Sequence, residues 1–230
     1  MKFYIKSFVI QLAVFFSITV YAKDVKVIDE VKNHDGSIWL VEKKDADYNV
    51  KYINAKGREY DNNVLVTSDI EGSNLSLNTE PAQKGSIDAV SLVMNYPRDA
   101  YIFKFSFGEV PYLLSACKVL TLPSAEKKQA VALLTLCSKK NVIANVTLAD
   151  TDADKLLLPG NLSLKRKVKT LIGTDKSFLY GDDKRHKPKN PYLIKGDVVE
   201  IIDCQDSMLK IRFMSQSGVV VGWIHYVDIL

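Results

Sequence analysis

The sequence has little of what most catalytic centres need. Its 230 residues include only three histidines, His34, His186 and His225, and no Gly-x-Ser-x-Gly motif that would mark the nucleophile of a serine hydrolase. The histidine spacing of zinc hydrolases is also missing. A cysteine peptidase needs a thiol beside a histidine base, and Cys117 lacks the flanking residues that such enzymes show. We therefore expect a protein that is not an enzyme and that uses no cofactor and no metal.

An excess of one charge is missing as well. The formal net charge is +4 for the whole sequence, and removal of the first 22 residues takes away two lysines, Lys2 and Lys6, and leaves +2. A balance that small predicts neither nucleic-acid binding nor strong attachment to a membrane surface. The hydrophobic fraction of 47% is that of an ordinary folded protein.

Long apolar runs are confined to the N-terminus. Residues 8–20 are almost entirely apolar, follow two lysines and end at Val20-Tyr21-Ala22, which is the pattern of a secretory signal peptide cleaved after Ala22. The run is shorter than the ~20 residues of a membrane span, although an uncleaved anchor is the alternative. We expect a signal peptide at 1–22 and a periplasmic or secreted mature chain, with no stable membrane insertion after cleavage.

Three cysteines are present, Cys117, Cys137 and Cys204. Export would place them where disulfides form, and an odd number leaves one thiol over. We expect a Cys117–Cys137 disulfide with Cys204 reduced. The alternatives are three buried thiols that pack as small apolar side chains, and a metal site, for which no cysteine–histidine pair has the short spacing of zinc ligands.

The region before residue 165 has the alternation of half-buried strands. Strands are predicted at 38–41, 48–53, 64–67, 89–94 and 100–107. A loop is predicted at 74–86, which is rich in Ser, Asn, Gly and Pro. The aromatic row Tyr101, Phe103, Phe105 and Phe107 is interpreted as core packing rather than as a ligand platform.

Two segments leave alternatives open. Residues 123–134 begin with Pro-Ser and contain good helix formers, yet 131–137 could equally be a strand, and we expect one or two helical turns followed by a hairpin of 131–137 with 142–148. Residues 150–161 contain three aspartates, but Lys155 and Asn161 stand where a calcium-binding EF-hand loop needs glycine and glutamate. We interpret that run as a solvated turn at the junction between two domains.

The last sixty residues predict a small barrel. Five short strands are expected, at 176–180, 192–194, 198–203, 208–214 and 219–224, and residues 227–230 close the chain. A flat sheet of that size would expose its edges and could not cover its own core.

The Lys195-Gly196-Asp197 turn and the Gly222-Trp223-Ile224 strand, with 198–202 and 209–213 between them, resemble a bacterial SH3-like domain. The resemblance covers about residues 170–230 and implies an SH3-like barrel that binds a ligand. One departure is that Phe-Leu-Tyr-Gly-Asp-Asp at 178–183 replaces the usual Asn-Val-Arg-Ser-Gly-Pro. Because that loop shapes the ligand site, the cell-wall peptide binding of some relatives is not carried over.

The predicted fold is therefore mainly β. A β-rich antiparallel N-terminal domain, with or without one short helix, spans 23–164, and the SH3-like barrel spans 165–230. Residues 182–189 mix acidic and basic side chains and lie in the sequence near several tyrosines. Aromatic side chains rimmed by charge suit peptide or protein partners. The alternative is that 182–189 is simply a solvated loop. The candidate binding residues are Tyr180, Asp182, Asp183, Arg185, His186, Tyr192 and Tyr226.

These observations favour a non-catalytic exported protein that binds a peptide, a cell-wall fragment or a protein. One alternative is an immunity or inhibitor protein that neutralises a secreted antibacterial toxin. The other is a cell-wall hydrolase whose N-terminal catalytic domain has no recognisable motif.

Overall fold

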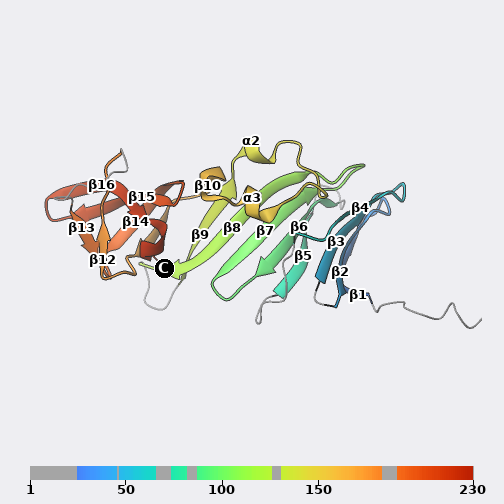
Figure 1. Cartoon of the computed structure of the whole chain (residues 1–230), viewed down its shortest axis with the longest axis horizontal. Coiled ribbons are helices and arrows are strands. Elements are labelled where there is room, and N and C mark those ends of the chain that lie inside the picture. Colours follow the sequence, from blue (N-terminus) through green and yellow to red (C-terminus); the bar gives the residue numbers. More distant parts are fainter. Residues whose placement is uncertain are drawn as a thin grey trace, which may run out of the picture.

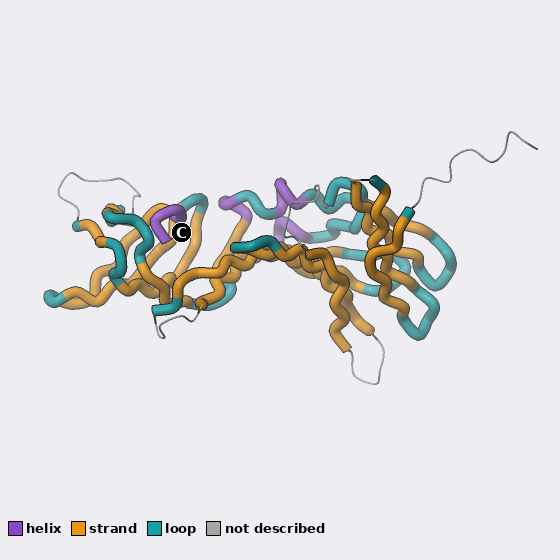
Figure 2. Tube along the Cα trace, turned by 90° about the horizontal axis from the view of Figure 1, so that it is seen from below, coloured by secondary structure: helices purple, strands orange, loops and turns teal. Residues whose placement is uncertain are grey.

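The computed structural model describes residues 25–45, 47–65, 74–81, 87–125, 131–182 and 191–229. The predicted signal peptide at 1–22 lies outside these residues. The described chain is mainly β, and all pairings between its described strands are antiparallel, which confirms the predicted fold class. The strands form three groups that follow one another along the long axis of the molecule (Figures 1 and 2).

The first group is a meander in the order β1-β2-β3-β4. Its strands are β1 (Lys26–Lys32), β2 (Ile38–Lys44), β3 (Asp47–Ile53) and β4 (Glu59–Asn62). The strand predicted at 64–67 is wrong for its two described residues. The Asn62 Oδ1 accepts hydrogen bonds from the backbone N–H groups of Val64 and Leu65 at 3.0 and 2.8 Å, which turns the chain directly after β4.

The second group is a sheet in the order β10-β9-β8-β7-β6-β5. Its strands are β5 (Asn74–Pro81), β6 (Ile87–Asn95), β7 (Asp99–Ser106), β8 (Leu113–Pro123), β9 (Val131–Ser138) and β10 (Leu162–Leu164). The loop predicted at 74–86 is wrong over 74–81, because this segment pairs with β6 along its length as an edge strand. A polar composition is tolerated there, since an edge strand is covered less than a central one.

The hairpin predicted between 131–137 and 142–148 is also wrong. β9 pairs instead with β8 and β10, while the chain after β9 forms two single-turn helices, α2 (Lys140–Ile143) and α3 (Ala153–Leu156), and a 3-10 turn, η1 (Pro159–Asn161). Val142 and Ile143 pack against the first core instead of forming a ladder. The helical turns predicted before β9 fall largely on 126–130, outside the described residues.

One face of the six-stranded sheet packs on the meander to form the first hydrophobic core. Trp39 and Tyr52 of the meander are fully buried, and the Trp39 ring centroid lies 5.1 Å from that of Phe105 and 4.9 Å from that of Tyr52. Phe103 is fully buried on the same face as Phe105. The aromatic row predicted to be core packing therefore supplies the centre of this core.

The C-terminal unit comprises two further sheets and a 3-10 turn. One sheet has the order β11-β14-β15-β16, and the other pairs β12 with β13. The elements are β11 (Val168–Leu171), β12 (Lys176–Phe178), β13 (Tyr192–Ile194), β14 (Val198–Gln205), β15 (Met208–Ser215), β16 (Gly218–His225) and η2 (Tyr226–Ile229). At the end of the described chain, η2 buries Ile229.

The second hydrophobic core joins the C-terminal unit to the far end of the six-stranded sheet. Leu122 of β8 and Leu134 of β9 belong to the same buried cluster as Ile201, Ile211 and Ile224 of the C-terminal unit. The predicted domain boundary between 164 and 165 therefore does not separate two cores. The β8–β9 hairpin supplies buried side chains to both cores, because β8 also contributes Leu113 and Ala116 to the first one.

Candidate functional site

An exposed group of aromatic side chains forms where β12 pairs with β13. The register places Phe178 opposite Tyr192, and these side chains are 36% and 53% exposed. The Lys176 Nζ lies 4.8 Å from the Phe178 ring centroid and 4.3 Å from that of Tyr192. A cation over two ring faces holds the rings in place by cation–π attraction.

Tyr180 extends this group towards β16. Its backbone forms two hydrogen bonds with that of Trp223, at 2.8 and 2.9 Å, and its hydroxyl lies 3.2 Å from the Nε2 of His225. Gly222 permits the bridge, because a Cβ there would lie 3.0 Å from the Cδ2 of Leu179 and 3.1 Å from the carbonyl oxygen of Tyr180. The glycine of the Gly-Trp-Ile sequence thus has a direct packing role.

We call the set Lys176, Phe178, Tyr180, Tyr192 and His225 the aromatic strip. The alternation of β12 explains its composition: Ser177 and Leu179 are buried in the C-terminal unit, so their neighbours lie towards solvent. Tyr180 and Tyr192 were among the predicted binding residues, and the other three members were not. The Lys-x-Phe-x-Tyr alternation at 176–180 was the available signal.

A salt bridge lies on the Trp223 side of Tyr180. The Asp182 Oδ1 is 3.1 Å from the Lys210 Nζ, which in turn lies 5.4 Å from the Trp223 ring centroid. The hydrogen bond from Lys210, its positive charge and the Trp223 side chain hold the pKa of the Asp182 carboxyl below its usual value. Since the Asp182 side chain is 87% exposed, this pair adds charge beside the strip and little stability.

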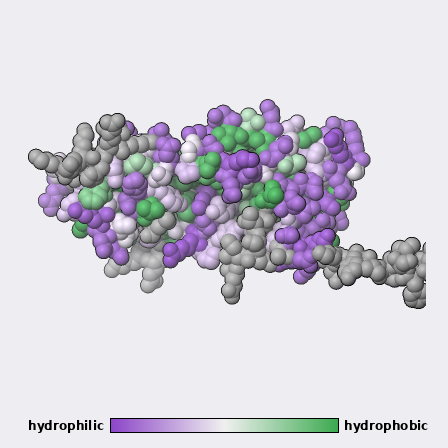
Figure 3. Space-filling model, viewed as in Figure 1, coloured by the Kyte–Doolittle hydropathy of each residue, from purple (hydrophilic) through white to green (hydrophobic). Residues whose placement is uncertain are grey.

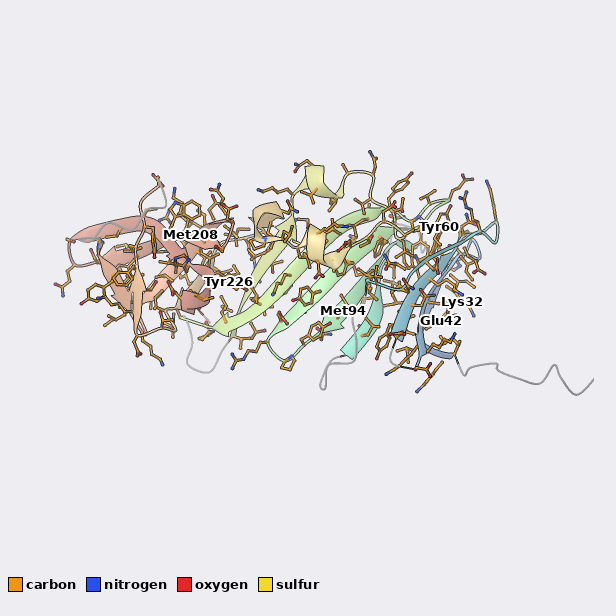
Figure 4. The ribbon with its side chains drawn as sticks, in the orientation of Figure 1. Lys32, Glu42, Tyr60, Met94, Met208 and Tyr226 are labelled. Carbon is orange, nitrogen blue, oxygen red and sulfur yellow. A yellow bond between two sulfur atoms is a disulfide. The ribbon has the colours of Figure 1, made fainter. Side chains whose placement is uncertain are left out.

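The remaining predicted binding residues divide into two groups. Asp183, Arg185 and His186 lie outside the described residues. Tyr226 is apart from the strip, on the side of the C-terminal unit that faces the six-stranded sheet (Figure 4). Burial strongly raises the pKa of its hydroxyl, and the nearby Asp99 and Tyr101 of β7 add to that effect.

The Tyr226 hydroxyl gives a prediction about stability. Its oxygen is buried and has no hydrogen-bond partner among the described residues, and burial of an unpaired hydroxyl costs ~1–3 kcal/mol. We expect Tyr226→Phe to raise the free energy of unfolding by about 1 kcal/mol in urea titrations. Tyr112→Phe, at a 44% exposed tyrosine, is the control and should change stability by less than ~0.5 kcal/mol. A loss of stability in Tyr226→Phe would show that the hydroxyl is satisfied.

The cysteines follow the prediction. Cys117 and Cys137 stand opposite each other on β8 and β9 and form a disulfide. Cys204 is buried in the second core and is not part of a disulfide.

The described residues contain no group of three or more potential metal ligands, and the His225 imidazole contacts a tyrosine hydroxyl rather than a serine or cysteine. Within the same residues, no helix has the length and apolar character needed to cross a membrane. Comparison with protein-family models, with curated proteins and with solved structures finds no match for the chain.

Proposed function

We propose that the chain is an exported, non-catalytic binding protein whose aromatic strip binds a peptide or protein partner of the cell envelope. The observation that carries the proposal is the strip itself, in which the Lys176 ammonium lies over two exposed rings. The Cys117–Cys137 disulfide is compatible with an oxidising compartment. Export rests on the signal peptide expected at 1–22.

The strip has the properties of a binding surface rather than of a solvated face. Aromatic residues are enriched at protein interfaces because they bring large contact area at a low cost in conformational entropy. The cation–π contacts to Lys176 and the contact between Tyr180 and His225 favour one arrangement of these rings before any partner arrives. A surface that is already ordered loses less entropy on binding.

The test compares the mature, oxidised chain with a Phe178→Ala/Tyr192→Ala variant. Binding to purified peptidoglycan stem peptides and to isolated envelope proteins would be measured by calorimetry. Loss of interface aromatics at a binding hot spot costs about 2 kcal/mol or more, so we expect affinity to fall by at least ~30-fold.

Tyr112→Ala is the matched control, because Tyr112 is an exposed aromatic directly before β8, outside the strip. Its affinity should equal that of the unchanged chain. Equal affinity of all three proteins for the same partner would contradict the proposed role of the strip.

A further inference from the structure

A pocket of about 660 Å³ lies beside α3 and η1, on the face of the six-stranded sheet that packs on the meander. Its apolar part is formed by Leu65 and Met94, which are almost completely buried, and by Leu157 and Leu158 of the segment between α3 and η1. Figure 3 shows apolar surface gathered on this side of the molecule around α2 and α3, bordered by hydrophilic surface. The volume lies within the range of small-molecule sites.

Polar groups also line the pocket, next to Met94, which the β6–β7 register places opposite Tyr101. The pairing of β7 with β8 places Tyr101 opposite Lys118. The Lys118 Nζ is 3.2 Å from the Asp99 Oδ2 and 5.2 Å from the Tyr101 ring centroid. The Tyr101 hydroxyl donates to the same Asp99 oxygen at 3.3 Å, and the Tyr96 ring meets that of Tyr101 edge-on at 5.5 Å.

Lys118 carries its charge despite partial burial. Burial pushes the pKa of its ammonium group down, but the contacts with Tyr101 and Asp99 together outweigh burial and leave the pKa above its usual value. The side chains of Lys118 and Asp99 are 26% and 22% exposed. The pocket thus presents one positive and one negative group, each close to solvent and already neutralised by the other.

The Lys118–Asp99 pair determines which ligand charges the pocket can accept. An anion would contact Lys118 but would meet repulsion from Asp99, and a cation would face the reverse. A charge removed from water without a partner is costly. A molecule with both an ammonium and a carboxylate group can contact both members of the pair without adding net charge. Of the other charged lining residues, Arg98 and Asp154 are exposed, whereas Asp152 is paired with Lys155 at 2.9 Å.

We propose that this pocket binds a short apolar peptide with both ends free. Its carboxylate contacts Lys118 and Arg98, its ammonium group contacts Asp99 and Asp154, and its apolar side chains lie on Leu65, Met94 and the α3–η1 segment. Two or three apolar residues match the size of the pocket. The site is separate from the aromatic strip, since the two share no residue.

The test uses four probes that differ only at their ends: the dipeptide Leu-Leu, its N-acetyl form, its C-terminal amide, and the form with both caps. Binding to the mature, oxidised chain would be measured by calorimetry. We expect Leu-Leu to bind, each single cap to weaken binding by about 10-fold or more, and the doubly capped form to bind weakest. Equal binding of all four, or no binding of Leu-Leu, would overturn the proposal.

Two variants test whether the peptide binds in this pocket. Lys118→Met should remove the preference for a free carboxylate, so that Leu-Leu and its amide bind equally. Leu158→Ala, at a 53% exposed position, should weaken all four probes without affecting folding. Phe178→Ala/Tyr192→Ala should leave every affinity unchanged, which separates this site from the strip. Unchanged binding in both pocket variants would contradict the assigned site.

Discussion

Leu134→Ala is expected to destabilise the C-terminal unit, although Leu134 lies in a strand of the preceding region. Its side chain is 0% exposed and belongs to the same buried cluster as Ile201 and Ile211 of β14 and β15. Truncation of a buried leucine removes apolar contacts and leaves a cavity, which costs ~2–5 kcal/mol. Because the cluster spans both regions, we expect that loss to appear in the C-terminal strands as well as in β9.

The measurement combines urea unfolding with hydrogen exchange of the β14–β16 amides. The neighbouring Leu133 offers a matched control, because it is 41% exposed and, one residue along the strand, points to the opposite face. Leu133→Ala should change stability by less than ~0.5 kcal/mol. If Leu134→Ala left the protection of β14–β16 intact, the two regions would have independent cores.

Loss of the Cys117–Cys137 disulfide is expected to lower the free energy of unfolding by about 3 kcal/mol. The bridge closes a loop with a sequence separation of 20, and the chain-entropy model gives about 3 kcal/mol for a loop of that size. It also links β8 and β9 at the end of their ladder away from the turn, in the hairpin that serves both cores.

Urea titrations with and without a reducing agent would measure this effect. The Cys117→Ser/Cys137→Ser variant should match the reduced chain and should not respond to the reducing agent. Cys204→Ala is the control for other thiol effects, and its response to the reducing agent should be that of the unchanged chain. A disulfide-free variant as stable as the oxidised chain would contradict the prediction.

Local alternation was enough to predict the strands with one buried face. Residues 48–53 and 100–107 became β3 and β7 because their apolar side chains alternate with polar ones. The same signal failed for β5, a polar edge strand, and for Val64 and Leu65, whose apolar character belongs to a bend held by Asn62. Which strands pair depends on packing between residues that are far apart in the sequence. For this reason the predicted hairpin of 131–137 with 142–148 was wrong.

The candidate site was predictable only in part. Tyr180 and Tyr192 stood out as aromatics near a charged loop, but the register that places Lys176 over two rings is a property of the β12–β13 pairing. The pocket lay beyond sequence reasoning altogether. Its lining comes from segments around 64–65, 94–101, 118 and 152–159, which only the folded sheet brings together.

The most direct test of the proposed function is crosslinking in the exported protein. A photoreactive phenylalanine analogue would replace Tyr192 in one strain and Tyr112 in another, since both side chains are exposed. We expect illumination to join a defined envelope peptide or protein to position 192 and not to position 112. Products of equal kind and yield at both positions, or none at 192, would contradict it.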